Sequence, residues 1–334
     1  MITGRLSTQP VPPLRYLSAA DADACLPDVG TRVELAAAAL RALGRGTAEM
    51  PPKIGVHPRP GALIHAMPAW LRDGDLVGLK WVAAYPDNKR RGLPAINGLV
   101  VLNDAETGLP TWIVEAGRIT AVRTAAVSGV AIRLYTPDAR QVTLLGAGVQ
   151  ARSHLEVIFA LLPDAHVNLY DRHFERAGAA ADDANSAAGR EWVSAVNDAR
   201  AAVGQAELVL TVASMGGVSQ QMDSDWLTDG SVVVAVDFAT YASAELARTA
   251  RDFVVDDRGQ FLFYRDGGSF DSYPEPTATL GEVLDAGEPV ATSAAGDARP
   301  VLVTHLGVGL ADVLFADAIV GRAAASGRGT ELPR

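Results

Sequence analysis

The chain has 334 residues, which is too long for one ordinary domain and suits two. Apolar residues make up 49% of it and charged residues 20%, so it can bury a large core and is not a disordered chain. The net charge of −10 without a basic run argues against nucleic acid as a partner, and the single cysteine, Cys25, excludes an internal disulfide and a thiolate metal cluster. No apolar stretch approaches the roughly 18 residues of a membrane span, and the N-terminus lacks a signal-peptide core. We therefore expect a cytoplasmic protein that binds no membrane.

The first third of the chain mixes helix and strand signals. Residues 1–30 are expected to be an irregular segment, and the helical spacing of apolar residues in 31–46 predicts a helix that ends at Gly44 and Gly46. Short apolar runs bounded by turn signals predict strands at 61–71, 76–85, 96–102 and 110–116, the last two joined by a hairpin turn at 103–110. We expect an α+β domain with a mostly antiparallel sheet.

From residue 119 onward the pattern becomes regular. A long helix is predicted over 119–135, and helices then alternate with strands at 141–146, 166–171, 192–196, 207–213, 231–238 and 247–257. Such alternation predicts an α/β fold with a doubly wound parallel sheet covered on both faces. The tail, 305–327, predicts one amphipathic helix.

The segment 144–154 carries the features of a phosphate-binding turn. Gly146, Gly148 and Ala151 follow the G-x-G-x-x-A pattern between a predicted strand and a predicted helix. The first glycine permits the tight turn, the second lets the backbone approach a pyrophosphate, and the alanine allows close packing. Asp171 follows the next strand, 25 residues after Gly146, where an acid can meet the adenosine ribose. The whole array predicts dinucleotide binding.

Asp171 also bears on the choice of dinucleotide. A carboxylate that accepts from both ribose hydroxyls repels a 2′-phosphate, so the residue favours NAD(H). Arg172 beside it could stack on adenine or pair with that phosphate, which keeps NADP(H) open as the alternative. For Asp171 itself the alternative is an ordinary helix cap.

Lys80 lies in the middle of the predicted strand 76–85, with apolar neighbours on both faces. Burial would lower the pKa of the amine into the working range of a general acid or base, or the charge would pair with a substrate carboxylate. The alternative is a lysine at a sheet edge, whose stem is covered while its amine reaches solvent.

Two further positions are candidates for chemistry. Arg123 and Thr124 lie in the first turns of the predicted helix 119–135, where an arginine can clamp a carboxylate with two parallel hydrogen bonds; a surface arginine is the alternative. Asp237 lies at the C-terminal end of the predicted strand 231–238, where open parallel sheets place reacting groups, and is either catalytic or the cap of the next helix. The sequence has no H-x-x-x-H pair and no G-x-S-x-G motif, so it predicts neither a metal site nor nucleophilic hydrolysis.

The order of these features resembles the ornithine cyclodeaminase/mu-crystallin family. The resemblance covers nearly the whole chain from about residue 14, and the blocks RTAA and GAGVQA are its most specific parts. The matching segments are MPP at 50–52, HAMPAWL at 65–71, GLKW at 78–81, NDAETGLP at 103–110, ITAVRTAAVSG at 119–129, LLGAGVQARSH at 144–154, EL at 245–246 and HLGVGLADV at 305–313.

The resemblance implies a homodimer with two domains per chain. Residues 1–120, completed by the C-terminal helix in 306–334, would bind substrate and form the subunit contact, and residues 121–305 would form a Rossmann domain that carries NAD(P). Substrate-carboxylate and proton-relay positions are matched by Lys80, Arg123 and Thr124. Cofactor positions are matched by Gly146, Gly148, Val149, Gln150, Asp171 and Arg172, with Thr211, Val212 and Ala213 expected near the ribose–nicotinamide link.

Two positions depart from the family pattern. The family usually has an arginine after the proline of segment 50–52, as a second carboxylate clamp, whereas this chain has Lys53, which keeps the charge but not the bidentate fork. The cyclodeaminases carry an amine-contacting aspartate two residues beyond Asp237, where this chain has Ala239. Two residues along a strand keep the same face but move the group by about 6–7 Å. Either Asp237 substitutes through a local bend or no carboxylate contacts the amine, and both outcomes weaken a literal ornithine cyclodeaminase assignment.

The leading hypothesis is an NAD(P)-dependent oxidoreductase that acts on the C–N bond of a small amino acid or its imine. In it, Arg123 and Lys53 hold the substrate carboxylate, Lys80 stabilises charge or relays protons, and Asp237 handles the proton on nitrogen. One alternative is an amino-acid cyclodeaminase of the ornithine-to-proline type, which releases ammonia with no net NADH. Another is a cofactor-gated binding protein for a small ligand.

Overall fold

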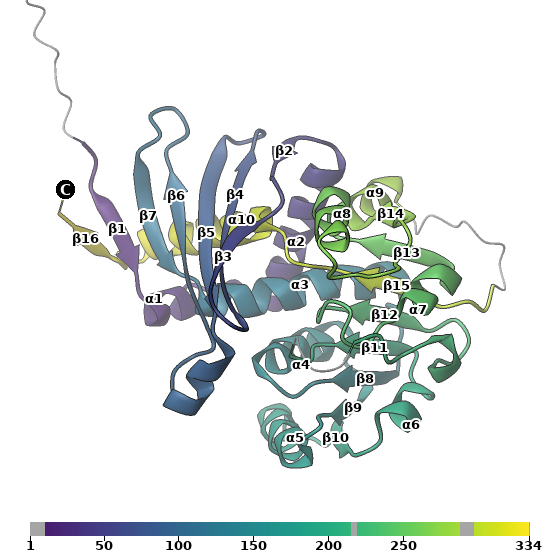
Figure 1. Ribbon diagram of the computed structural model, residues 1–334. Coiled ribbons are helices and arrows are strands. Elements are labelled where there is room, and N and C mark those ends of the chain that lie inside the picture. Colours follow the sequence, from purple (N-terminus) through teal and green to yellow (C-terminus); the bar gives the residue numbers. More distant parts are fainter. Residues whose placement is uncertain (1–10, 215–218, 288–296, 334) are drawn as a thin grey trace, which may run out of the picture.

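The computed structural model describes residues 11–214, 219–287 and 297–333. Two β-sheets lie side by side, and the long helix α3 (Gly117–Tyr135) runs from the first sheet toward the second (Figure 1). The first described strand, β1 (Leu14–Leu17), pairs with the last, β16 (Thr330–Leu332), at the outer edge of the first sheet. Both ends of the described chain therefore belong to the same sheet.

Within the described residues the first sheet contains eight strands. Besides β1 and β16 these are β2 (Ala48–Glu49), β3 (Ile54–Arg59), β4 (Ala62–Leu71), β5 (Leu76–Ala84), β6 (Ile96–Asn103) and β7 (Pro110–Glu115). Their order is β16-β1-β7-β6-β5-β4-β2, with β3 paired to β4, and every pair is antiparallel except β1 with β7. One face packs against helix α10 (Gly309–Ala325), which contacts β4, β5 and β6.

Two short elements lie where the sequence predicts an irregular segment. Strand β1 has four residues, and helix α1 (Ala19–Ala24) has six and begins at a capping box formed by Ser18 and Asp21. Elements this short carry too few residues to show a period, so the expectation of an irregular segment is wrong for residues 14–24. The next helix, α2 (Val29–Gly44), begins slightly before its predicted start, with Asp28 as its cap.

The second sheet also contains eight strands among the described residues, and all are parallel. They are β8 (Gln141–Leu145), β9 (His166–Tyr170), β10 (Val193–Val196), β11 (Leu208–Thr211), β12 (Val232–Ala235), β13 (Asp252–Val255), β14 (Ala278–Thr279) and β15 (Val301–Thr304). Their order, β10-β9-β8-β11-β12-β15-β13-β14, is that of a doubly wound sheet, which confirms the predicted α/β class with a Rossmann-type domain. Strand β15, which lies between β12 and β13, was not predicted, because its four residues are all buried and show no alternation.

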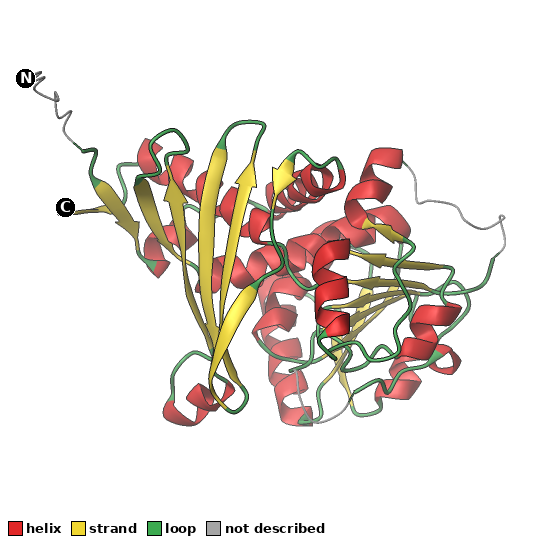
Figure 2. Cartoon of the chain, turned by 45° about the horizontal axis from the view of Figure 1, so that its top comes forward, coloured by secondary structure: helices red, strands yellow, loops and turns green. Residues whose placement is uncertain are grey.

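Helices surround the second sheet (Figure 2). They are α4 (Val149–Leu161), α5 (Phe174–Ala188), α6 (Ala199–Val203), α7 (Ala244–Thr249), α8 (Arg258–Asp266) and α9 (Leu280–Ala286), and two short 3-10 helices, η1 (Pro86–Arg91) and η2 (Ser224–Trp226), lie in loops. No described helix is both long enough and apolar enough to cross a membrane. The cytoplasmic location stays a prediction.

A close backbone contact between α2 and α9 joins the two halves of the molecule. A Cβ atom at Gly44 would lie 2.7 Å from the carbonyl carbon of Gly281, so glycine at both positions lets the helices meet. Helix α3 forms a second joint, because it packs against α2, α4 and β6. The domain division predicted from the sequence places its boundary inside α3, between residues 120 and 121, and stays a prediction.

Candidate functional site

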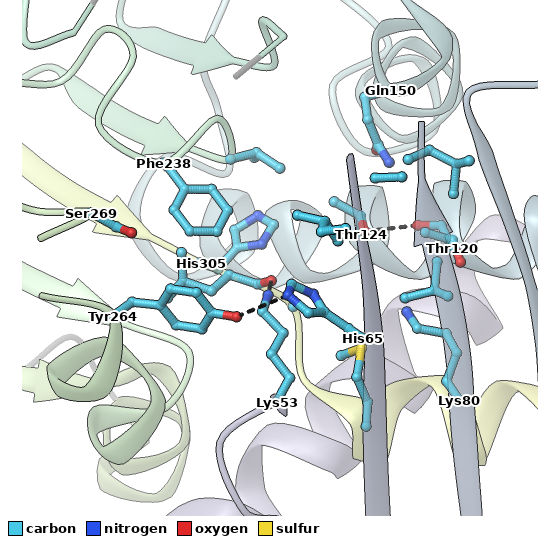
Figure 3. Close-up of a pocket in the computed structure, with 18 of the residues that line it drawn as sticks. Lys53, His65, Lys80, Thr120, Thr124, Gln150, Phe238, Tyr264, Ser269 and His305 are labelled. Carbon is cyan, nitrogen blue, oxygen red and sulfur yellow. Dashed lines mark hydrogen bonds between the residues drawn. The ribbon is translucent and has the colours of Figure 1, made fainter. Parts of the chain in front are cut away.

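A cavity of about 900 Å³ lies between the two sheets (Figure 3). Strands β4 and β5 form one wall, and the segments that follow β12 and β15 form the other. This position, at the carboxyl ends of parallel strands, is where open α/β sheets bind ligands. The predicted substrate-site residues Lys53, Lys80, Arg123 and Thr124 all line it.

Lys80 is fully buried on the inner face of β5, where its register partners are Met67 and Val100. Its Nζ lies 2.7 Å from Oδ2 of Asp312, so the amine does not reach solvent. Burial and the nearby Arg123 lower the pKa of Lys80 to about 7, while Asp312 acts in the opposite direction. The amine can therefore exchange a proton near neutral pH.

Asp312 is the centre of the charged cluster. It lies in the first turn of α10, fully buried, and its Oδ1 accepts a 2.9 Å hydrogen bond from Nε of Arg123 while Oδ2 faces Lys80. One carboxylate thus holds two cations from β5 and α3 at fixed positions. No role for Asp312 was predicted from the sequence, although an acid inside the apolar run GLADVLF is a signal that could have indicated it.

Arg123 is almost fully buried, and its Nε bond to Asp312 fixes the guanidinium. A side chain at Gly307 would collide with this group, and Gly307 also has a φ of 91°, so glycine is required there twice over. In the described part of the chain no hydrogen bond uses either Nη group of Arg123. Both Nη groups are therefore left as donors for a carboxylate in the cavity.

Lys53 reaches the cavity from the loop between β2 and β3. Its Nζ donates a 2.6 Å hydrogen bond to the carbonyl of Leu306 and lies 5.6 Å and 5.2 Å from the ring centres of Phe238 and Tyr264. Burial lowers the pKa of Lys53 to about 8, and the nearby Asp256 opposes this shift. A lysine can hold a carboxylate here as a point charge, without an arginine fork.

The buried carboxylate of Asp256 fixes the loop between β15 and α10, which contacts both Lys53 and Arg123. It accepts backbone hydrogen bonds from Leu306 at 2.8 Å and Gly307 at 2.7 Å. Burial raises its pKa to about 6, against these bonds and the charge of Lys53. Asp256 was not predicted from the sequence, although its position at the end of a valine-rich strand is the same signal that indicated Asp237.

Asp237 lies beside the cavity, outside its described lining. Its Oδ1 accepts a 2.6 Å hydrogen bond from the Thr211 hydroxyl, and its Oδ2 accepts a 3.3 Å bond from the Ala213 backbone. Burial raises the pKa of Asp237 to about 7. The structure thus brings Asp237 together with the turn predicted to contact the nicotinamide ribose, while Ala239 lines the cavity.

The turn before α4 has the shape of a pyrophosphate cradle. Gly146 has a φ of 114°, and a Cβ there would lie 2.9 Å from the Val212 backbone, whereas a Cβ at Gly148 would meet nothing within 4 Å. No side chain caps α4, so its first N–H groups are left without a side-chain partner and can bind a phosphate. Val149 at the first position of the helix is 70% exposed, so this turn lies at the surface. Gln150, one position further, lines the cavity.

The Asp171 carboxylate lies at this turn and is hydrogen-bonded to its backbone. Its Oδ2 accepts from the Ala147 backbone at 3.0 Å and its Oδ1 accepts from the His173 backbone at 2.9 Å, and Arg172 beside it is exposed. Each carboxylate oxygen can accept a further bond, so Asp171 can still bind ribose hydroxyls. The cradle residues therefore fit a dinucleotide.

The family model described as ornithine cyclodeaminase/mu-crystallin family matches residues 26–325. The chain belongs to this family. The nodulation efficiency protein NfeD of Rhizobium meliloti is 35% identical over 323 residues, which cover 96% of this chain and 98% of that protein. The Delta(1)-pyrroline-2-carboxylate reductase of Bacillus thuringiensis subsp. konkukian is 28% identical over 278 residues, 80% of this chain and 83% of the reductase.

Solved structures share the whole architecture. The Thermococcus litoralis Delta(1)-pyrroline-2-carboxylate reductase in complex with NADH and L-proline superposes with a TM-score of 0.83 at 25% identity, covering 95% of this chain and 100% of that one. An archaeal alanine dehydrogenase dimer with bound NAD shares the fold with a TM-score of 0.82 at 23% identity, covering 96% and 99% of the two chains. The family predicted from the sequence is confirmed, and the roles of individual residues stay predictions.

Replacing Asp171 with Ser, with Arg172 left in place, should move cofactor preference from NADH toward NADPH. Each charge-assisted bond to ribose contributes on the order of 1.5–3 kcal/mol, so the ratio of the two dissociation constants should change at least about tenfold. Direct titration of both cofactors measures it, and adding Arg172→Ala should cancel the gain in NADPH affinity. A wild-type protein that already prefers NADPH would contradict the role given to Asp171.

Proposed function

We propose that the chain is an NAD(H)-dependent oxidoreductase that interconverts small 2-imino acids and the corresponding amino acids. Its family and its likeness to a reductase solved with NADH and L-proline support the enzyme class, the cofactor and the kind of substrate. The observation that carries the proposal is the buried cluster in which Asp312 holds Lys80 and Arg123 at the wall of a cavity that Gln150 of the cofactor turn also lines.

The net charge of the buried groups around the cavity matches a substrate with one carboxylate. Three cations face two buried carboxylates here: Lys53, Lys80 and Arg123 against Asp256 and Asp312. When all five groups are ionised, one positive charge remains, which a single substrate carboxylate would neutralise. The Nη groups of Arg123 and the Nζ of Lys53 are the donors placed for it, because Asp312 occupies the Nε of Arg123.

A dinucleotide held by the turn before α4 and by Asp171 would supply hydride transfer to or from the substrate α-carbon. Arg123 and Lys53 hold the carboxylate, so that the α-carbon and nitrogen lie toward Lys80. In the direction of reduction, Lys80 gives a proton to the nitrogen lone pair as the imine becomes an amine; in oxidation, the neutral amine of Lys80 takes that proton back. Apolar side chains of Met67 and Val82 cover this end of the cavity and limit access of water.

The described lining of the cavity contains no aspartate or glutamate. A substrate with a second ammonium group, such as ornithine or lysine, would therefore lack a charged partner there, and Ala239 stands where the cyclodeaminases carry one. This favours an uncharged substrate side chain and the oxidoreductase over the cyclodeaminase. A binding protein without turnover would have no need of an amine whose pKa lies near 7.

The function is tested by incubating the protein with NADH and pyrroline-2-carboxylate, or with NAD⁺ and small amino acids. We expect a change in NADH that depends on the substrate, and Lys80→Ala should lower kcat by at least about 100-fold, the contribution of a general acid or base. Arg123→Ala should lower kcat/KM by a similar factor, because it leaves the carboxylate unpaired. Both variants should keep wild-type affinity for NADH, and Lys89→Ala, an exposed lysine of η1, is the matched control.

Ammonia release without a change in NADH would show a cyclodeaminase, and binding without either would show a binding protein.

The pH profile tests the partnership of Lys80 and Asp312. Imine reduction needs protonated Lys80, so kcat/KM should fall as pH rises through about 7, while amino-acid oxidation should rise over the same range. Asp312→Asn removes the charge that raises the pKa of Lys80, so both limbs should move to lower pH. Asp317→Asn, an exposed acid on the same helix, should leave them in place. Limbs that do not move in Asp312→Asn would assign the titration to another group.

For Asp237 we propose a positioning role, holding the 211–213 turn against the cofactor. Asp237→Asn should then weaken NADH binding and leave the pH profile unchanged in shape, and Thr211→Val, which removes the hydroxyl that donates to Asp237, should have the same effect. Proton transfer at the substrate nitrogen, the role expected from the sequence, would instead lower kcat strongly, remove one limb of the profile and leave NADH binding intact. Kinetics of both variants over pH 5–9 separate the two roles.

A homodimer is proposed from the uncovered face of the first sheet. Ile54, Ala66, Trp81 and Leu99 form one row across β3, β4, β5 and β6, on the face opposite Lys80. Ile54 is 64% exposed and Trp81 46%, and Val56 nearby is 57% exposed. A monomer rarely exposes such a contiguous apolar row, and the archaeal structure with the same fold is described as a dimer.

Trp81→Glu should convert the dimer to a monomer, because it places a charge at the centre of that row. Light scattering during gel filtration measures the molar mass. Phe174→Glu changes an equally exposed aromatic residue on α5, far along the chain from this face, and should leave the dimer intact. A wild-type mass equal to that of one chain would contradict the dimer.

A further inference from the structure

A buried network of one serine and two histidines lies beside the cavity and takes no part in the chemistry above. Oγ of Ser128 in α3 lies 2.9 Å from Nε2 of His154 in α4 and 2.9 Å from Nε2 of His305, which follows β15. Nδ1 of His154 lies 2.7 Å from the carbonyl oxygen of Gln150. All three side chains are almost completely buried, so every polar atom in the network needs a partner.

The direction of these hydrogen bonds follows from the one atom that can only accept. The Gln150 carbonyl must receive a proton from Nδ1 of His154, so Nε2 of that neutral ring is an acceptor. The hydroxyl of Ser128 therefore donates to His154 and has only lone pairs left for His305. Hence His305 donates from Nε2, and its Nδ1 carries a lone pair. Burial lowers the pKa of His154 to about 4 and that of His305 well below its usual value, which keeps both rings neutral.

The lone pair on Nδ1 of His305 is unused. In the described part of the chain this buried atom has no hydrogen-bond partner, and His305 lines the cavity between Phe238 and Thr124 (Figure 3). The charged groups that lower the pKa of His305, Arg123 and Lys53, are cations whose donors are engaged or placed for a carboxylate. A buried acceptor without a partner is costly, so a ligand N–H is the group that fits it.

We propose that Nδ1 of His305 accepts a hydrogen bond from the substrate nitrogen, and that this bond selects protonated imines and amines over their oxygen analogues. The inference rests on the function proposed above. A protonated imine or an amine presents an N–H to this lone pair. When hydride adds to the protonated imine, a new lone pair forms on nitrogen, and Lys80 gives its proton to that lone pair. The oxygen of a 2-oxo acid or a cyclic ether presents a lone pair instead, and two facing lone pairs repel.

The test compares L-proline with tetrahydrofuran-2-carboxylate, which has the same ring with an ether oxygen in place of N–H. Dissociation constants from the protein–NADH complex, measured by calorimetry, should differ by about 10- to 100-fold in the wild type, the range for one hydrogen bond from a charged donor. His305→Gln can keep an N–H toward Ser128 but has no acceptor at the Nδ1 position, so the two ligands should bind within about threefold of each other. NADH affinity should stay within twofold of the wild type.

Ser128→Ala is the second variant, and it leaves His305 in place. Without the serine, nothing holds the proton of His305 on Nε2, so the Nδ1–H tautomer becomes populated and donates into the cavity. The ether ligand should then bind more tightly than it does to the wild type, and L-proline more weakly. A merely structural role for the network would weaken both ligands alike.

The outcomes separate this inference from the function on which it rests. If the wild type turns over an amino acid but the ligand ratio is the same in His305→Gln, the inference alone is wrong. If His305→Gln loses affinity for NADH instead, the lone pair serves the cofactor and the inference is also wrong. If the wild type neither turns over nor binds any amino acid or imino acid, the proposed function fails and this inference fails with it.

Discussion

The site depends on the single buried carboxylate of Asp312. It pairs with Lys80 at 2.7 Å and with Arg123 at 2.9 Å, and all three side chains are buried. Charges removed from water in this way are strongly unfavourable unless each has a partner, and removing one partner typically costs about 3–5 kcal/mol. The pairing therefore fixes α10 against β5 and α3, and it sets the position and the proton affinity of the lysine at the same time.

The loop between β15 and α10 transmits this constraint to the rest of the cavity. Asp256 holds its backbone at Leu306 and Gly307, and Lys53 bonds to the carbonyl of Leu306. The residue that begins the loop, His305, is in turn held by Ser128 in α3. Lys53, His305 and helix α4 are thus joined through hydrogen bonds and packed side chains. Such a connected frame suits the proposed reaction, which needs the α-carbon and the nicotinamide to be aligned.

Sequence patterns predicted the elements that are long or periodic, and the site residues whose type conflicts with their surroundings. Helix α3 and strands β4 to β7 follow their predicted ranges closely, and Lys80 was noticed because a cation in an apolar strand is out of place. Strands β1 and β15 were missed because four residues show no period. For Asp312 the apolar run around it could have marked the acid as out of place, but its role could not be predicted, because its partners Lys80 and Arg123 are far away in sequence.

The most direct test of the account is a crystal structure of the protein with NADH and L-proline bound. We expect the proline carboxylate within hydrogen-bonding distance of the Nη groups of Arg123 and of Nζ of Lys53, with its nitrogen between Nζ of Lys80 and Nδ1 of His305 and the Lys80–Asp312 pair intact. A carboxylate bound away from Arg123, or a nitrogen that faces neither Lys80 nor His305, would contradict the claim that the Asp312 cluster forms the substrate site.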